Sequence, residues 1–203
     1  MKFAFPIFPG AEELDLVGPW EALALARDYG EREIELFTVA LTREPVRLRG
    51  GLRVVPDHAF GSEPKADAIV VPGGPGTRDE PAWRPVVAWV SARRDTPLVT
   101  SVCTGAFVLA RAGVLDGRTA TTHYARLDEL REQHPEVHVV DGLRVVDEGD
   151  VITAGGVTAG IDLGLHLVER YYGGELAATV AEVMEYAAPK AGASAGSQTR
   201  LGE

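Results

Sequence analysis

The sequence predicts an α/β protein, a three-layer sandwich with a mostly parallel central sheet. Three observations indicate this fold class. Strand-like and helix-like segments alternate along the chain. Apolar runs such as Ala66–Val71 are nearly continuous, as expected of a strand that is covered on both faces. Several such runs end in glycine-rich or polar loops, and in open α/β sheets ligands bind beside the carboxyl ends of the strands.

Length and composition fit one globular domain. The chain has 203 residues, of which 45% are hydrophobic and 25% charged. A chain of this length can bury about 70% of its unfolded surface. We expect a single domain over residues 1–187, and a tail at 188–203 whose small, polar composition predicts disorder.

Charge and cysteine content exclude several classes of protein. The formal net charge of −10 argues against a nucleic-acid partner, because binding phosphates requires a basic face. A lone cysteine forms no internal disulfide, so nothing requires an oxidising compartment. No signal peptide is recognisable, and no stretch approaches the ~20 apolar residues of a membrane span. We therefore expect a cytoplasmic protein with no membrane partner.

In the first half of the chain, apolar and β-branched runs predict strands at Lys2–Phe8, Glu33–Leu41 and Ala66–Val71. A helix is expected to begin near Gly18, because Pro19 favours a first helical turn, and to end at Gly30. A second helix is expected over Pro81–Arg94. Val46–Val55, interrupted by two glycines, predicts a hairpin at a sheet edge.

The second half continues the alternation. A strand beginning at Pro97 precedes a helix over Thr104–Ala112, and a further helix is expected over Ala125–Gln133. Short strands are expected within 117–124, at Val137–Val140 and within Leu143–Ala154. A helix follows the glycines at 155 and 156, with Ile161, Leu165 and Val168 on one face, and the last helix is expected over Glu175–Ala187.

Cys103, the only cysteine, lies where a buried strand turns into a helix. This context resembles the strand-to-helix turn that presents the nucleophile of serine hydrolases. The amide N–H groups and positive dipole end of the new helix would favour the thiolate over the thiol. The alternative is a structural cysteine that packs as a small hydrophobe.

Two other loops that follow strands are expected to lie near Cys103. In the loop Gly73–Gly76, backbone N–H groups could stabilise a developing negative charge, together with the N–H of Thr104. The alternative is an ordinary turn, and the loop lacks the lysine of a phosphate-binding loop. The segment Gly10–Asp15 follows the first strand and brings carboxylates to the same edge.

Asp15 is a candidate general acid. It lies between two leucines, where burial would raise its pKa, so a protonated carboxyl could hydrogen-bond to a thiolate. Its neighbours Glu12 and Glu13 are expected to cap the helix and complement its dipole. His123, at the end of a threonine run, could pair with Cys103 as a base or orient a substrate. The other four histidines lack metal-ligand spacing, and we expect no metal and no cofactor.

Four segments together resemble the ThiJ/PfpI superfamily: AEELDLVGPWEAL, VVPGGPGT, SVCTGAFVLARAGVLDGRTATTHY and TAGGVTAGIDLGLHLVE. The resemblance extends over roughly Phe3–Tyr186, and within the superfamily the chain most resembles isocyanide hydratases and the sensor halves of AraC-type regulators. It implies a flavodoxin-like sandwich, usually a homodimer, with a nucleophilic cysteine on a strained elbow.

The resemblance also implies roles for individual residues. Cys103 matches the hydratase nucleophile, Asp15 its acid/base carboxylate, and Thr104 the threonine after the nucleophile. Gly73 and Gly74 lie in the loop that helps to form an oxyanion-type pocket, and Val157 stands where hydratases have an aliphatic residue near the site. PfpI-type peptidases carry histidine directly after the cysteine, so Thr104 argues against protease activity.

The function expected from these residues is a cysteine-dependent hydratase that acts on a small electrophilic molecule and converts an isocyanide to an N-substituted formamide. One alternative is a non-enzymatic redox sensor in which Cys103 is oxidised and Asp15 stabilises the product. Another is glyoxalase- or deglycase-type activity on 2-oxoaldehydes, for which only His123 is available as an additional base.

Overall fold

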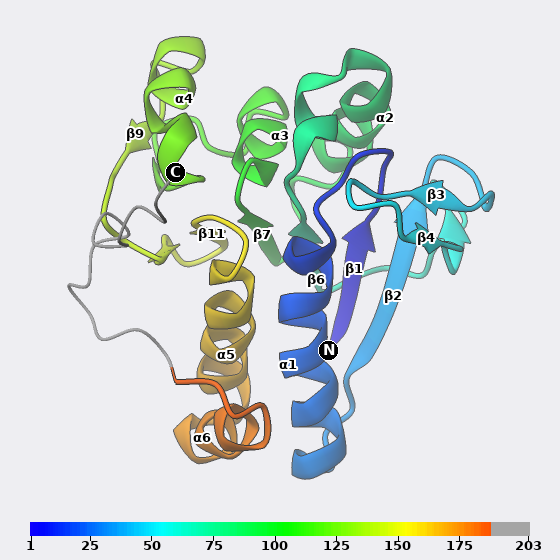
Figure 1. Ribbon diagram of the computed structural model, residues 1–203, viewed down its shortest axis with the longest axis vertical. Helices are drawn as coiled ribbons and strands as arrows, with labels where there is room; N and C mark the ends of the chain where they lie inside the picture. The colour runs from blue at the N-terminus through cyan, green and yellow to red at the C-terminus, as the bar shows by residue number, and fades with distance from the viewer. Residues whose placement is uncertain (188–203) are drawn as a thin grey trace, which may run out of the picture.

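A computed structural model describes residues 1–187, and its centre is a seven-stranded sheet with the order β10-β11-β7-β6-β1-β2-β5 (Figure 1). Its strands are β1 (Lys2–Pro6), β2 (Glu35–Ala40), β5 (His58–Ala59), β6 (Ala68–Val71), β7 (Leu98–Val102), β10 (Val145–Asp147) and β11 (Val151–Ala154). Neighbouring strands are parallel except for the pair β10 and β11. The predicted α/β fold with a mostly parallel sheet is confirmed. The predicted tail at 188–203 lies outside the described residues.

Helices flank this sheet (Figure 1). They are α1 (Glu13–Gly30), α2 (Glu80–Ser91), α3 (Gly105–Arg111), α4 (Leu127–Gln133), α5 (Ala159–Tyr172) and α6 (Gly174–Val183), with short 3-10 turns η1 (Pro75–Arg78) and η2 (Tyr124–Arg126). One group of helices, α1, α5 and α6, packs together, and α2 packs against α3. Within the described residues, no helix is long and apolar enough to cross a bilayer.

The predicted hairpin forms, but it does not extend the main sheet. Its strands β3 (Val46–Arg47) and β4 (Arg53–Val54) make a separate two-stranded sheet. Backbone hydrogen bonds attach it to the β1–α1 loop instead: Gly10 N–H donates to Arg47 O at 3.1 Å and Arg49 N–H donates to Ala11 O at 2.9 Å. The edge strands of the main sheet are β5 and β10. A second two-stranded sheet pairs β8 (Thr119–Ala120) with β9 (His138–Val139).

Helix α1 begins five residues earlier than expected, at Glu13 rather than near Gly18. Pro19 lies inside the helix, where its missing N–H leaves the carbonyl of Asp15 without an intrahelical donor. The predicted start of the helix was based on Pro19 as a start signal, but the first helical turn forms before Pro19 in the chain. As a result Asp15 belongs to the first turn of a helix and not to a loop.

Small residues let α1 and α5 approach closely. A Cβ built on Gly164 would lie 2.7 Å from the Cβ of Ala22, and one on Gly160 would lie 3.1 Å from Cδ of Pro19. The buried face of α5 agrees with the predicted one at Val168 and differs from it at Ile161 and Leu165. Gly160, Leu163, Gly164, Leu167 and Val168 are buried, whereas Ile161 and Leu165 are only partly covered. Apolar spacing alone did not identify the glycines as the contact surface.

Candidate active site

Four loops meet at one edge of the sheet because β1, β6, β7 and β11 run parallel and end there. β1 leads to Asp15 on α1, and β6 leads to the glycine loop at 72–76. β7 ends at Cys103, and β11 leads through Gly155–Val157 into α5. The first three loops were expected to meet; the fourth joins them because β11 pairs with β7.

Cys103 occupies a strained turn. Its φ is +56°, a left-handed conformation that non-glycine residues rarely adopt. Its N–H donates to Ala154 O at 3.0 Å and Gly155 O at 2.8 Å, and its carbonyl accepts from the Thr122 hydroxyl at 2.8 Å. Close packing also requires Gly105, since a Cβ there would lie 2.4 Å from Val71 O. The surrounding bonds hold the strained residue in place, with the cysteine 5% exposed.

Asp15 is fully buried, with 0% exposure. Its Oδ2 accepts a hydrogen bond from Gly73 N–H at 2.9 Å, but its Oδ1 has no partner among the described residues. The Cys103 thiol interacts with this carboxylate strongly enough to lower its pKa, although no contact with full hydrogen-bond geometry joins the two side chains. The site therefore contains a carboxylate that interacts with the thiol and has one buried oxygen without a donor.

Burial shifts the pKa values of both groups. It raises the pKa of Asp15 to about 7, against the lowering effect of the Gly73 hydrogen bond, and the charge of Glu12 raises it further. Burial, followed by the negative charge of Asp15, raises the pKa of Cys103 to about 12. Between pH values of about 7 and 12 the pair thus holds one proton, shared between the carboxylate and the thiol.

This result differs from the expectation that the helix start would favour the thiolate. Backbone hydrogen bonds from Thr104 and Val157, and one from the Thr104 side chain, do lower the pKa of the thiol. Their effect is smaller than that of burial and of the Asp15 charge. The helix is also short, at seven residues, and its N-terminal amides act on a sulfur with little contact to solvent.

The glycine loop orients the other groups. Gly73 N–H holds Asp15, and Gly74 N–H donates to Thr104 Oγ1 at 2.9 Å. A Cβ on Gly73 would lie 2.5 Å from Thr104 N, and Gly74 has a φ of +110°. These two N–H groups were expected to stabilise charge on a substrate, but both are engaged by side chains of the protein.

Val157 reaches the sulfur through its backbone. It is a β-branched residue with a φ of +42°, and this unusual conformation directs its N–H toward Cys103. The sequence identified the position by resemblance, as an aliphatic side chain near the site. In the structure it is the backbone N–H of Val157 that acts on the thiol and lowers its pKa, although no contact with full hydrogen-bond geometry joins this N–H to the sulfur among the described residues.

His123 lies at the rim and not against the thiol. Its Nδ1 accepts from Ala125 N–H at 3.2 Å, and its ring packs against Gly156, where an added Cβ would lie 2.5 Å from Cδ2. Burial lowers the pKa of His123, as do the charges of Arg126 and Arg78. No hydrogen bond between His123 and Cys103 is found among the described residues.

Glu12 and Glu13 do not cap α1 with their side chains. Glu12 forms an ion pair with Arg49 at 3.3 Å, and Glu13 Oε1 accepts from Gly50 N–H at 2.6 Å. Both contacts attach the hairpin to the helix.

Thr122, whose hydroxyl donates to the carbonyl of Cys103, was not identified as a site residue from the sequence, although the threonine run before His123 was visible. In residues 1–187, no cluster of three His, Cys, Asp or Glu side chains is arranged to hold a metal ion.

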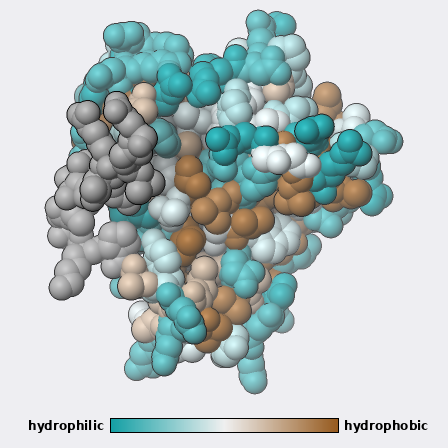
Figure 2. Space-filling view, in the orientation of Figure 1, coloured by the Kyte–Doolittle hydropathy of each residue, from teal (hydrophilic) through white to brown (hydrophobic). Residues whose placement is uncertain are grey.

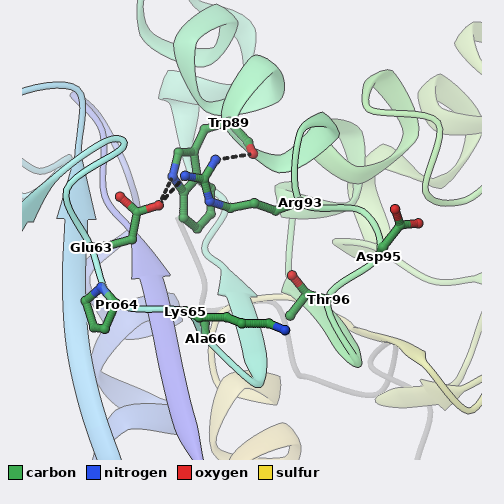
Figure 3. Close-up of a pocket in the computed structure, with 8 residues that line it drawn as sticks. All are labelled: Glu63, Pro64, Lys65, Ala66, Trp89, Arg93, Asp95 and Thr96. Atoms are coloured by element: carbon green, nitrogen blue, oxygen red, sulfur yellow. Dashed lines mark hydrogen bonds and ion pairs between the residues drawn. The ribbon is translucent and has the colours of Figure 1, made fainter.

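A separate cavity of about 420 Å³ lies among residues that precede β6 and β7, at the amino ends of those strands (Figure 3). Its lining residues are Glu63, Pro64, Lys65, Ala66, Trp89, Arg93, Asp95 and Thr96. None of the predicted site residues lines it. The space therefore lies apart from the candidate site residues, which are closely packed around Cys103.

Comparison with known proteins adds to this geometry. Residues 1–170 match the DJ-1/PfpI family. An isonitrile hydratase from Pseudomonas putida is 37% identical over 188 residues, which cover 92% of this chain and 79% of the relative. The HTH-type transcriptional regulator CdhR from Pseudomonas aeruginosa is 33% identical over 183 residues, 89% of this chain and 53% of the regulator. This chain thus spans about half the length of that regulator.

Solved structures agree. A ThiJ/PfpI family protein from Pseudomonas syringae has a TM-score of 0.82 at 30% identity, with 93% of this chain and 76% of that chain covered. Drosophila melanogaster DJ-1beta has the same fold, with a TM-score of 0.77 at 24% identity over 92% of this chain and 98% of that chain. The chain belongs to the DJ-1/PfpI family.

Proposed function

We propose that the protein is a cysteine-dependent hydratase that converts an isocyanide and water to an N-substituted formamide. Cys103 is the nucleophile, Asp15 transfers the proton, and Thr104 helps to hold the reacting groups. The relative from Pseudomonas putida that is named isonitrile hydratase matches 92% of this chain, which supports the proposal.

The observation that carries this proposal is the unpartnered Oδ1 of Asp15. A buried carboxylate oxygen without a donor is costly, so such groups point to a catalytic or ligand-binding role. The Asp15 carboxyl interacts with the Cys103 thiol, and its pKa of about 7 suits proton transfer near neutral pH. A nucleophile and a proton carrier are therefore packed together.

The chemistry follows from these groups. As Asp15 takes the thiol proton, the sulfur attacks the terminal carbon of the isocyanide and forms a C–S bond. Asp15 then gives this proton to the same carbon, which yields a thioimidate. Water adds to the thioimidate carbon, and one of its protons reaches the nitrogen. The C–S bond breaks to release the formamide, and the remaining proton returns to the Asp15–Cys103 pair.

The surrounding backbone positions this pair. Gly73 N–H fixes one oxygen of Asp15, which leaves the other available to the substrate. Thr104 N–H and Val157 N–H act on the sulfur and stabilise the negative charge that returns to it when the C–S bond breaks. The Cys103 side chain is only 5% exposed, which favours a narrow electrophile such as a terminal isocyanide carbon.

The test is incubation with an aryl isocyanide, with formamide followed by NMR, for the wild-type protein and for Cys103→Ala. Turnover in the wild type and none in the variant is the expected result. Circular dichroism shows whether the variant keeps its fold. Undiminished turnover in Cys103→Ala, or none in the wild type, contradicts the proposed function.

The structure gives less support to the two alternatives. A redox sensor requires an accessible thiolate, but burial raises the pKa of Cys103 and leaves the residue 5% exposed. An oxoaldehyde-specific enzyme was expected to use His123, whose Nδ1 accepts from Ala125 N–H and whose ring packs on Gly156.

We also propose that a second copy of the chain covers an exposed apolar face beside the site, as the family resemblance implies. Figure 2 shows apolar side chains together over α1, α5 and the hairpin. Val17 on α1, and Leu52 and Val55 beside β4, are large apolar residues that remain exposed. Light scattering is expected to give the mass of a dimer for the wild type and of a monomer for Val17→Arg. A monomeric wild type excludes the dimer.

A further inference from the structure

Arg144, just before β10, connects three side chains around the first turn of α5. Its guanidinium forms an ion pair with Asp162, with Nε 2.7 Å from Oδ2. It also donates to the Thr158 hydroxyl at 3.1 Å and to the Tyr186 hydroxyl at 3.4 Å. Tyr186 in turn donates to both oxygens of Asp162 at 3.2 Å. We call Arg144, Asp162 and Tyr186 the α5 clamp.

The α5 clamp lies next to the residues that contact Cys103. Thr158 directly follows Val157, whose backbone N–H acts on the sulfur. The backbone of Arg144 is connected as well: its carbonyl accepts from Gly155 N–H at 2.9 Å, and Gly155 O accepts from Cys103 N–H at 2.8 Å. Both ends of the Gly155–Thr158 turn are therefore attached to Arg144.

This attachment constrains the backbone conformation of Val157. Val157 has a φ of +42°, which is unfavourable for a β-branched residue and persists only where surrounding contacts enforce it. A relaxed turn would move its N–H away from the sulfur. Tyr186 reaches the turn from beyond α6, because the chain reverses at Glu185, where φ is +50°. A distant part of the chain thus contributes to the conformation of the turn.

We infer that Arg144, Asp162 and Tyr186 are positioning residues that hold the Val157 N–H on the Cys103 sulfur and so set the reactivity of the thiol. This inference rests on the proposed role of Cys103 as the reacting group. None of the three touches the sulfur. The charged group that acts directly on the thiol is Asp15, from α1, while the glycine loop and the β11–α5 turn present uncharged backbone.

The test is the pH dependence of Cys103 alkylation by iodoacetamide, which requires no isocyanide turnover and stands even if the proposed function fails. If the clamp positions Val157, Arg144→Met and Asp162→Asn both raise the pH midpoint and slow alkylation at pH 8 at least threefold. A purely electrostatic influence predicts opposite shifts, since one variant loses a positive charge and the other a negative one. Opposite shifts, or none, overturn the inference.

A matched control exists on the same two elements. Arg170 of α5 pairs with Asp147 of β10 at 2.9 Å, toward the far end of the helix from Val157. Arg170→Met is expected to leave the midpoint unchanged, and a shift equal to that of Arg144→Met indicates general loosening and overturns the inference. Arg144→Lys is expected to recover part of the wild-type behaviour.

Tyr186→Phe covers the case in which the charged variants fail to fold, because it removes only one hydroxyl. An upward shift of the midpoint in this variant, with an unchanged melting temperature, supports the inference. An unchanged midpoint in folded Tyr186→Phe contradicts it.

Discussion

Two buried carboxylates, Asp15 and Glu63, lie at opposite ends of the parallel strands, and folding shifts their pKa values in opposite directions. Asp15, beside Cys103, has one donor to Oδ2 and none to Oδ1, and burial raises its pKa to about 7. Glu63, in the cavity at the other edge, is also buried, with a side chain that is 4% exposed. Its pKa is lowered even though burial opposes this.

The difference lies in the partners. Figure 3 shows that Glu63 accepts from Trp89 Nε1, at 2.9 Å, and forms an ion pair with Arg93. Glu63 also accepts from Gly61 N–H at 2.6 Å. Arg93 also lies over the Trp89 ring, 4.6 Å from its centroid. The cavity of about 420 Å³ therefore has a carboxylate whose hydrogen bonds are satisfied. The closely packed site around Cys103 has a carboxylate with one unsatisfied oxygen, and this incomplete bonding, not cavity volume, distinguishes the site that we propose to be reactive.

The largest effect is expected for Asp15→Asn. Without the carboxylate, proton transfer fails, and turnover of an isocyanide falls on the order of 10²–10⁴-fold. The variant also loses the charge that raises the pKa of the Cys103 thiol, so the midpoint of iodoacetamide alkylation moves to lower pH. Kinetics and alkylation are measured on the same preparation. Wild-type turnover in this variant contradicts the assigned role.

Asp15→Asn is also expected to change how the stability of the protein depends on pH. Because folding raises the pKa of Asp15 from 3.8 to about 7, the wild type loses stability as pH rises from about 4 through 7. The size of this loss is on the order of 4 kcal/mol. Asp15→Asn removes it, so urea unfolding at pH 8 is expected to show a more stable variant, with a smaller difference at pH 4. A less stable variant at pH 8 contradicts this sign.

A smaller effect is expected for Gly73→Ala. The added methyl meets Thr104 N at 2.5 Å and Asp15 Oδ2 at 2.9 Å, so the loop must move and release Asp15. Overpacking of this kind costs about 1–3 kcal/mol, and turnover falls with the loss of alignment. Gly174→Ala is the matched control, since its nearest neighbour would be 4.0 Å away. Equal effects in thermal unfolding and turnover for the two variants contradict the prediction.

The smallest effect on chemistry is expected at the other edge. Glu63→Gln removes the charge that pairs with Arg93 and lowers stability at pH 7 by about 1–3 kcal/mol, while turnover and Cys103 alkylation stay at wild-type values. Because the pKa of Glu63 is lowered, its contribution is present at neutral pH and is lost as pH falls. The stability difference between variant and wild type therefore shrinks toward acid pH. A marked loss of turnover in Glu63→Gln would mean that the cavity around Glu63 affects the chemistry at Cys103, which contradicts the prediction.

Much of the fold and of the candidate site followed from local patterns. Continuous apolar runs predicted β6 and β7, and the change from strand to helix placed Cys103 on a turn. Asp15 between two leucines indicated burial and a raised pKa. The start of α1 was predicted too late, because a proline signals a helix start statistically and yet is tolerated inside a helix when packing compensates for one lost hydrogen bond.

The candidate groups and the order of the elements could be read from the sequence, because strand and helix periodicity and turn chemistry are local. How these groups are bonded to one another depends on the tertiary structure. Asp15 and Thr104 accept the hydrogen bonds of the Gly73 and Gly74 N–H groups, and His123 lies at the rim. These arrangements depend on distances between separate loops. At Cys103, burial affects the pKa of the thiol more than the helix start does, because desolvation depends on every element packed around the sulfur and not on its neighbours in sequence.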